Sequence, residues 1–403
     1  MANRLGFRAT LNCSYIAYIV QASVNNIAPI LYIIMMREFD LSLGQIAFLM
    51  SFNFVVQICV DALGAAFADR IGYHICTVAA HFFAFAGLFG LGLFPYLFGN
   101  PFSGILLSTV FYAIGGGLIE VLVSPIVEAL PSEDKSGAMS ILHSFYCWGQ
   151  LGTVLISTLL LVILGDKYWF IIPAVWSLLP FVNAFLFMRV PIRHLSETHE
   201  RTSVRKLFGM KIYWMMMVLM LCAGASELSM SQWASLFAEL GLNVSKTVGD
   251  LLGPSMFALL MGISRVFYGI FCARINLRRY ILGSAVLCVA SYLVCVFAPW
   301  PIVSLLGCAV CGLSVGIMWP GTLSLAAERC PAGNTAIFAI LALCGDMGCS
   351  LGPALVGAVS SVSSDKFLSF TGEAAGLHAG LLSVVFFPAV MVVFAILLKQ
   401  KKQ

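Results

Sequence analysis

The sequence predicts an all-α membrane protein with twelve transmembrane helices in two pseudo-symmetric six-helix bundles. Three observations lead to this fold class. Hydrophobic residues make up 61% of the chain and charged residues only 10%, which no soluble domain of this length shows. Apolar segments of about 20 residues or more, the length that spans a bilayer, recur along the whole chain. The second half also repeats local features of the first, as in transporters built from structural repeats.

Each apolar segment is long enough to be a membrane span. The predicted spans are 10–36, 43–68, 74–97, 102–130, 137–164, 168–190, 211–238, 247–272, 279–299, 302–328, 335–360 and 376–398. The longest polar segment is rich in Arg and Lys and separates the first six spans from the last six. We therefore expect an N-terminal bundle at 1–190, a cytoplasmic linker at 191–210 and a C-terminal bundle at 211–403.

The basic residues predict the orientation. In this topology most of the 22 Lys and Arg residues fall on the side of the N-terminus, Arg265 lies within a span, and the opposite side carries Arg37, Lys167, Lys246 and Lys366. Positive charge in short loops collects on the cytoplasmic side. Both termini are therefore expected in the cytoplasm, with the protein in the cell membrane. Because the basic residues are dispersed among loops, no nucleic-acid partner is expected.

A loop between spans 2 and 3 carries a family signature. Gly64, Asp69, Arg70 and Gly72 resemble the G-x(4)-D-R-x-G motif of the major facilitator superfamily, and the segment leaving span 8 looks like a weaker second copy. The resemblance covers the whole chain and implies two six-helix bundles. It also implies that the motif latches the cytoplasmic ends of the helices. Asp61, eight residues before Asp69, is assigned to the same latch, with a direct role in transport as the alternative.

Spans 4 and 5 resemble one type within that superfamily. The segments 117–125 and 142–149 are similar to the fucose permease type, sugar:proton symporters with a Glu five residues before a Pro in span 4. Here these residues are Glu120 and Pro125. His143 and Tyr146 stand where that type has Gln and Asn, and a pair of asparagines replaces its span 1 Asp. The resemblance implies uptake of a sugar with protons.

Three acidic residues within spans are the predicted proton-coupling groups: Glu120, Glu227 and Asp346. A carboxylate at bilayer depth costs about 2.5–3.5 kcal/mol on insertion scales, so such residues mark functional sites. Burial favours the neutral form, which lets access of water or substrate decide whether the proton stays. The alternative for Glu120 and Asp346 is a structural contact with a neighbouring helix. Arg265 requires a carboxylate or carbonyl partner, which the sequence does not identify.

Polar and aromatic side chains in spans 1, 4, 5, 7 and 10 form the predicted substrate site. Amides and carboxylates bond hydroxyl groups, and aromatic rings stack on the apolar face of a sugar. Several of these residues share a helix face at spacings of three or four. His143 has a backbone carbonyl within its own bundle as an alternative partner. The predicted binding residues are Gln21, Asn25, Asn26, Glu120, His143, Tyr146, Gln150, Glu227, Gln232, Trp233 and Trp319.

These observations predict a secondary active transporter that takes up a monosaccharide or a similar small polar solute with protons. Proton-coupled export of a drug or metabolite is the alternative, and a non-transporting receptor or an enzyme is a remote one. The chain has no nucleophile, metal-ligand or nucleotide-binding motif, so we expect no enzyme activity, no metal and no cofactor. The expected partners are the substrate, a proton or sodium ion and the lipid bilayer, with the protein as a monomer. The substrate, coupling ion and direction stay open, as does uncoupled facilitation.

Overall fold

The chain is almost entirely helical in the computed structural model, which describes residues 6–130, 135–192, 208–271, 275–329, 335–363 and 366–398. Among these residues, 11 helical segments are long and apolar enough to cross a membrane, and Ile171–Phe187 is a shorter apolar helix. A helix of this shorter length extends about 25 Å at 1.5 Å per residue. The predicted all-α membrane fold is confirmed. The chain divides into two compact units, 1–197 and 198–403.

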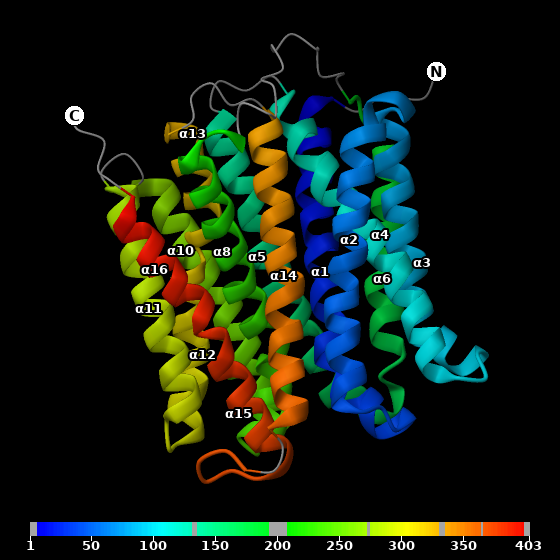
Figure 1. Cartoon of the computed structure of the whole chain (residues 1–403). Helices are drawn as coiled ribbons and strands as arrows, with labels where there is room; N and C mark the ends of the chain where they lie inside the picture. The colour runs from blue at the N-terminus through cyan, green and yellow to red at the C-terminus, as the bar shows by residue number, and fades with distance from the viewer. Residues whose placement is uncertain are drawn as a thin grey trace. The chain divides into compact units, whose positions relative to one another are not determined.

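The first unit is built from long, nearly uninterrupted helices (blue to green in Figure 1). Within it α4 packs against α1, α2 and α3, and α1 also packs against α5 and α6. The helices are α1 (Phe7–Phe39), α2 (Leu43–Ile71), α3 (Tyr73–Leu97), α4 (Pro101–Glu128), α5 (Lys135–Leu164) and α6 (Ile171–Phe187).

Local sequence explains where these helices begin and end. Ser42 accepts a hydrogen bond from the backbone N–H of Gln45, whose side chain returns one to Ser42, so a capping box begins α2. Asn100 caps α4, and Pro101 occupies its first turn, where a missing N–H costs nothing. Gly72 separates α2 from α3 with φ at 99°, a conformation that strains residues with a side chain.

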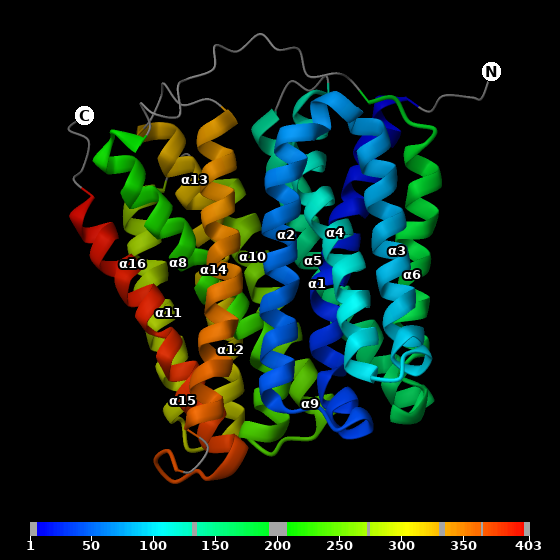
Figure 2. The same cartoon turned by 45° about the vertical axis from the view of Figure 1, so that its right-hand side comes forward.

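The second unit is more irregular (green to red in Figure 2). Its helices are α8 (Lys211–Leu236), α9 (Lys246–Asp250), α10 (Met256–Phe271), α11 (Leu277–Phe297), α12 (Pro301–Val315), α13 (Met318–Arg329), α14 (Thr335–Val362), α15 (Gly372–Val384) and α16 (Phe386–Leu397). The π-helical turns Phe237–Gly241 and Leu251–Ser255 extend α8 and join α9 to α10. Glycines of α8 and α14 lie where any Cβ would clash with the other helix, so these two helices pack closely.

Two predicted spans are not continuous helices. Within 302–328 the chain breaks between Val315 and Met318, and within 376–398 it breaks at Val385. Proline lacks an N–H, and its ring clashes with the carbonyl four residues earlier. Pro320 lies four residues after Gly316, in the first break. Pro388 lies four residues after Val384, which ends α15 at the second break. Each break therefore lies where a proline removes a helical hydrogen bond.

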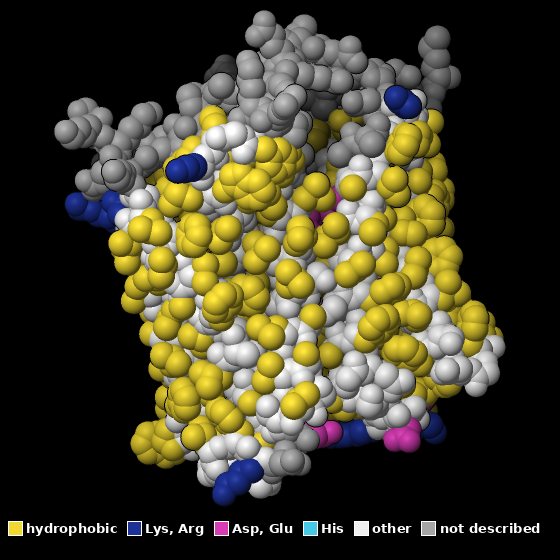
Figure 3. All heavy atoms as spheres, viewed as in Figure 1, with side chains coloured by type: hydrophobic (Ala, Val, Ile, Leu, Met, Phe, Trp, Pro, Cys, Tyr) yellow, Lys and Arg dark blue, Asp and Glu magenta, His cyan; other side chains and the backbone are white. Residues whose placement is uncertain are grey.

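The lateral surface of the helices is apolar. Figure 3 shows hydrophobic side chains along the helices, with Lys and Arg side chains near helix ends. Large apolar residues on this surface are exposed, among them Leu159, Val162 and Ile163 on α5 and Ile270 on α10. A bilayer covers such residues, so the chain is a multi-pass membrane protein.

Candidate functional site

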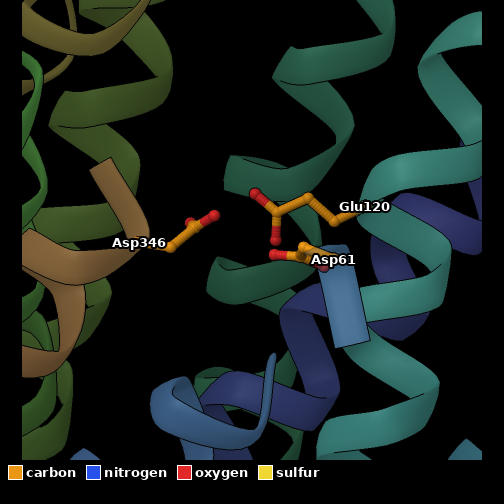
Figure 4. Close-up of side chains that lie close together, drawn as sticks. All are labelled: Asp61, Glu120 and Asp346. Carbon is orange, nitrogen blue, oxygen red and sulfur yellow. The ribbon is translucent and has the colours of Figure 1, made fainter. Parts of the chain in front are cut away.

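Two acidic side chains of the first unit lie close together. One carboxylate oxygen of Asp61, on α2, lies within 4.8 Å of one from Glu120, on α4. Figure 4 shows the two carboxyl groups next to each other; Asp346 in the same view belongs to α14 of the second unit. Gln21, on α1, donates a hydrogen bond from Nε2 to Oε2 of Glu120 at 2.5 Å. Asp61 is buried and Glu120 is partly exposed. We call Asp61 and Glu120 the carboxyl pair.

Buried amides on α1 and α2 form a second group, the amide cluster of Asn25, Asn53 and Gln57. Oδ1 of Asn25 accepts hydrogen bonds from Asn53 at 3.2 Å and from Gln57 at 2.8 Å. Gln57 also donates to Asn53 at 3.0 Å. The Nδ2 of Asn25 lies 3.5 Å from the hydroxyl of Tyr146, on α5. The cluster thus joins three helices with groups that also bond sugar hydroxyls.

Aromatic residues of α1 and α5 lie beside these groups. Tyr18 shares a hydrogen bond of 2.8 Å with Ser124, one turn after Glu120. The imidazole of His143 meets the Tyr18 ring edge-on, with centroids 5.2 Å apart. The predicted substrate residues Gln21, His143 and Tyr146 therefore do converge on a shared region of α1 and α5.

Other predicted residues of this unit have different surroundings. Asn26 donates to the backbone carbonyl of Ala22, one turn earlier, at 2.8 Å. Gln150 is buried, with 1% of its surface exposed. In the latch motif a Cβ on Gly64 would make only ordinary contact with α4, and the Arg70 guanidinium lies 6.0 Å from the Phe67 ring. The side chain of Asp69 lies outside the described residues.

In the second unit, Arg265 of α10 contacts an acidic side chain and a backbone carbonyl. Its Nη2 lies 3.3 Å from each carboxylate oxygen of Glu227, on α8. Its Nε donates to the backbone carbonyl of Gly316 at 3.3 Å. That carbonyl lies at the break between α12 and α13, four residues before Pro320, where no helical N–H can reach it. Arg265 thus neutralises a buried acid and satisfies a carbonyl that the helix break exposes.

The remaining predicted residues of this unit are mostly buried. Trp233 is fully buried, and its indole N–H donates to the carbonyl of Pro353 at 3.3 Å. The ring of Trp319 occupies the space that a side chain at Gly345 would fill. Asp346, next to that glycine, is buried, as is Gln232. The indole of Trp233 therefore acts in packing between α8 and α14.

Sequence reasoning missed Asn53, Gln57 and the partner of Arg265. A signal for the first two was present, because Asn53, Gln57 and Asp61 recur every four residues along an otherwise apolar helix, which places them on one face. The pairing of Arg265 with Glu227 had no such signal, since the two residues lie on different helices.

Comparisons with known proteins agree with this architecture. The family described as Major Facilitator Superfamily matches residues 13–353, while no curated protein sequence matches the chain. Among solved structures, a D-xylose-proton symporter is 14% identical, with a TM-score of 0.78 and coverage of 97% of this chain and 96% of that one. The nucleoside transporter NupG is 12% identical, with a TM-score of 0.76 and coverage of 97% and 100%.

The Escherichia coli fucose:proton symporter FucP is 15% identical, with a TM-score of 0.67 and coverage of 97% and 98%. At these identities the likeness is one of fold. The family match extends over most of the chain, and it agrees with the apolar helices and the glycine-rich packing described above. The chain therefore belongs to the Major Facilitator Superfamily of membrane transporters.

Proposed function

We propose that this protein is a secondary active transporter that works by alternating access and takes up a monosaccharide or a similar small polar solute together with protons. The bundles at 1–190 and 211–403 would rock about the linker at 191–210, with both termini in the cytoplasm and the protein in the cell membrane. The single observation that carries the proposal is the partly exposed Glu120 carboxylate, held by Gln21 beside a buried amide cluster. A titratable acid next to hydroxyl-binding groups allows proton and polar solute to be bound together.

The chemistry of the first unit favours a polar solute over a lipophilic one. Its α1, α2, α4 and α5 helices present amides, a carboxylate, an imidazole and phenols in one region. These groups hydrogen-bond one another, and their donors and acceptors can also bond the hydroxyl groups of a polar solute, whereas an apolar drug offers them no partner. Two of the solved structures with this fold are named as sugar-proton symporters and one as a nucleoside transporter, which guides the choice of solutes to test.

Uptake into proteoliposomes tests the proposal. Labelled hexoses, deoxyhexoses, pentoses, amino sugars and nucleosides are offered with and without an inward proton gradient, to the wild type and to Glu120→Gln. We expect one solute class to accumulate only with the gradient, and the variant to exchange that solute without accumulating it. Absence of uptake of every solute by folded protein would refute the substrate class, and lipophilic cations would be tested next. Accumulation by Glu120→Gln equal to that of the wild type would refute the role of Glu120.

A further inference from the structure

A groove between α10 and α11 lies on the lateral surface of the second unit. It has a volume of about 410 Å³, and residues of α10, α11 and α12 line it. This volume lies within the usual range of ligand pockets, about 300–1,000 Å³. The lining residues Ile263, Phe267 and Leu287 are exposed, so the groove opens on the apolar surface that a bilayer covers. We therefore expect a ligand of this groove to come from the membrane.

Glycines explain why the groove stays open. A Cβ on Gly312 of α12 would clash with the backbone of Phe257 on α10. A Cβ on Gly307 would lie 2.8 Å from the backbone nitrogen of Cys295 on α11, so α12 packs closely against both helices and forms the floor between them. On the α11 wall, a Cβ on Gly283 would meet no other part of the described chain within 4 Å. The floor is thus tightly packed, whereas the wall at Gly283 leaves room for a ligand.

Arg279, in the first turn of α11, is the charged residue among those that line the groove. It is exposed, and it forms no ion pair with an acidic side chain that the structure describes. The neighbouring Arg278 differs, since it donates to the backbone carbonyls of Ala395 at 2.9 Å and Ile396 at 2.7 Å, at the end of α16. Arg278 therefore fixes the position of α11, while the charge of Arg279 is available to a ligand.

The groove matches one leaflet of a bilayer in depth. Leu287 lies eight residues after Arg279, which is about 12 Å along a helix, and half of the hydrocarbon core is about 15 Å. Tyr280, next to Arg279, stacks on Tyr268 of α10 with ring centroids 6.2 Å apart. Tyr and basic side chains are typical of the headgroup level. The groove therefore has a basic, aromatic end at the headgroups and an apolar part at the depth of the acyl chains.

We propose that this groove binds one molecule of a phospholipid with a net negative headgroup, whose phosphate meets Arg279 and whose acyl chain lies along Gly283 and Leu287. The guanidinium forms strong hydrogen bonds with phosphate, and a positive charge without an acid beside it favours an anionic headgroup over a zwitterionic one. The apolar walls favour a lipid over a free anion. The site is independent of the solute carried and of the acidic residues of the first unit.

Competition between two lipids tests the site. Protein purified in a neutral detergent is offered equal amounts of phosphatidylglycerol and phosphatidylcholine with the same acyl chains, and native mass spectrometry counts the molecules retained. The variants are Arg279→Gln and Gly283→Leu. The matched controls are Arg8→Gln, an exposed residue in the first turn of α1, and Gly152→Leu on α5, where a Cβ also has open space. Thermal unfolding shows that each variant is folded and whether a lipid stabilises it.

We expect the wild type and both controls to retain one phosphatidylglycerol molecule, preferred about fivefold over phosphatidylcholine, as one basic residue near an anionic headgroup provides. Arg279→Gln should retain lipid without this preference. Gly283→Leu should retain neither lipid, because its side chain fills the groove while Arg279 is unchanged, and this separates a bound lipid from a free phosphate. Phosphatidylglycerol should raise the unfolding midpoint of the wild type but not that of Gly283→Leu.

The proposal is overturned if the wild type does not prefer phosphatidylglycerol, since the retained molecules are then bulk lipid only. It is also overturned if Arg279→Gln keeps the preference of the wild type, or if folded Gly283→Leu retains phosphatidylglycerol as the wild type does. Should Gly283→Leu fail to fold, the comparison of Arg279→Gln with Arg8→Gln decides.

Discussion

The pair formed by Arg265 and Glu227 allows a quantitative prediction, because its two members respond differently to losing their partner. The guanidinium lies 3.3 Å from both carboxylate oxygens, and the two side chains are 12% and 8% exposed. Removing one member of a buried ion pair costs about 3–5 kcal/mol. A carboxylate left alone can bind a proton, but a guanidinium cannot lose one. Glu227→Leu should therefore be the more damaging change.

We expect Glu227→Leu to lower the free energy of unfolding by about 4 kcal/mol, because it leaves the charge of Arg265 unpaired. Arg265→Leu should cost about 2–3 kcal/mol, of which about 1 kcal/mol is the lost hydrogen bond to Gly316. The double variant removes both charges and should cost about 1–2 kcal/mol, less than either single change, since apolar replacement of a buried ion pair is close to neutral.

Unfolding in mixed detergent micelles with increasing dodecyl sulfate measures these differences, with the exposed Lys167→Leu as the charge-removal control. The four proteins form a double-mutant cycle, which isolates the interaction between the two side chains. If the cost of the double variant equals the sum of the two single costs, the charges are not coupled and the reasoning fails. If Arg265→Leu costs more than Glu227→Leu, the asymmetry argued from protonation is wrong.

Two further predictions concern backbone packing. Gly117→Ala should lower the free energy of unfolding by about 1–3 kcal/mol through overpacking, whereas Gly64→Ala, with ordinary contacts only, should leave it within error. Equal effects of the two variants in thermal unfolding would contradict this. Pro320→Ala should restore an N–H for the Gly316 carbonyl and close the break between α12 and α13. Hydrogen exchange of the amides after Gly316 should slow at least tenfold, and unchanged exchange would show that the break does not depend on the proline.

The helical fold was predictable from the sequence because membrane insertion depends on local composition. A segment such as 43–68 must satisfy its backbone hydrogen bonds internally in lipid, so an apolar run of that length specifies a helix without knowledge of its neighbours. At the helix breaks the sequence supplies a proline, since Pro320 and Pro388 each lie four residues after the carbonyl that they displace. Pro29, Pro125 and Pro353 lie inside continuous helices, so proline alone did not determine where a helix breaks.

The site was predictable only in part. Glu120 is identifiable from the cost of a carboxylate within a span, and Gln21 and Asn25 from their helical spacing. Their partners are not, because hydrogen bonds between helices depend on rotation and depth, which composition leaves undetermined. Asn53 and Gln57 donate to Asn25 from another helix. Their spacing places them on one face of α2, but it does not show that this face meets Asn25.

The sequence by itself therefore determined the class of the protein: which segments enter the membrane, which polar residues are costly there, and which family the chain resembles. Only the tertiary structure decided which of those residues meet. Asp61 lies beside Glu120 because Gly117, on α4, leaves room for it. Arg265 is neutralised by Glu227 of α8, and it also donates to the backbone carbonyl of Gly316 at the end of α12. The physical reason is that insertion energies add residue by residue along the chain, whereas charge pairing requires two side chains from separate helices to be brought within a few ångströms.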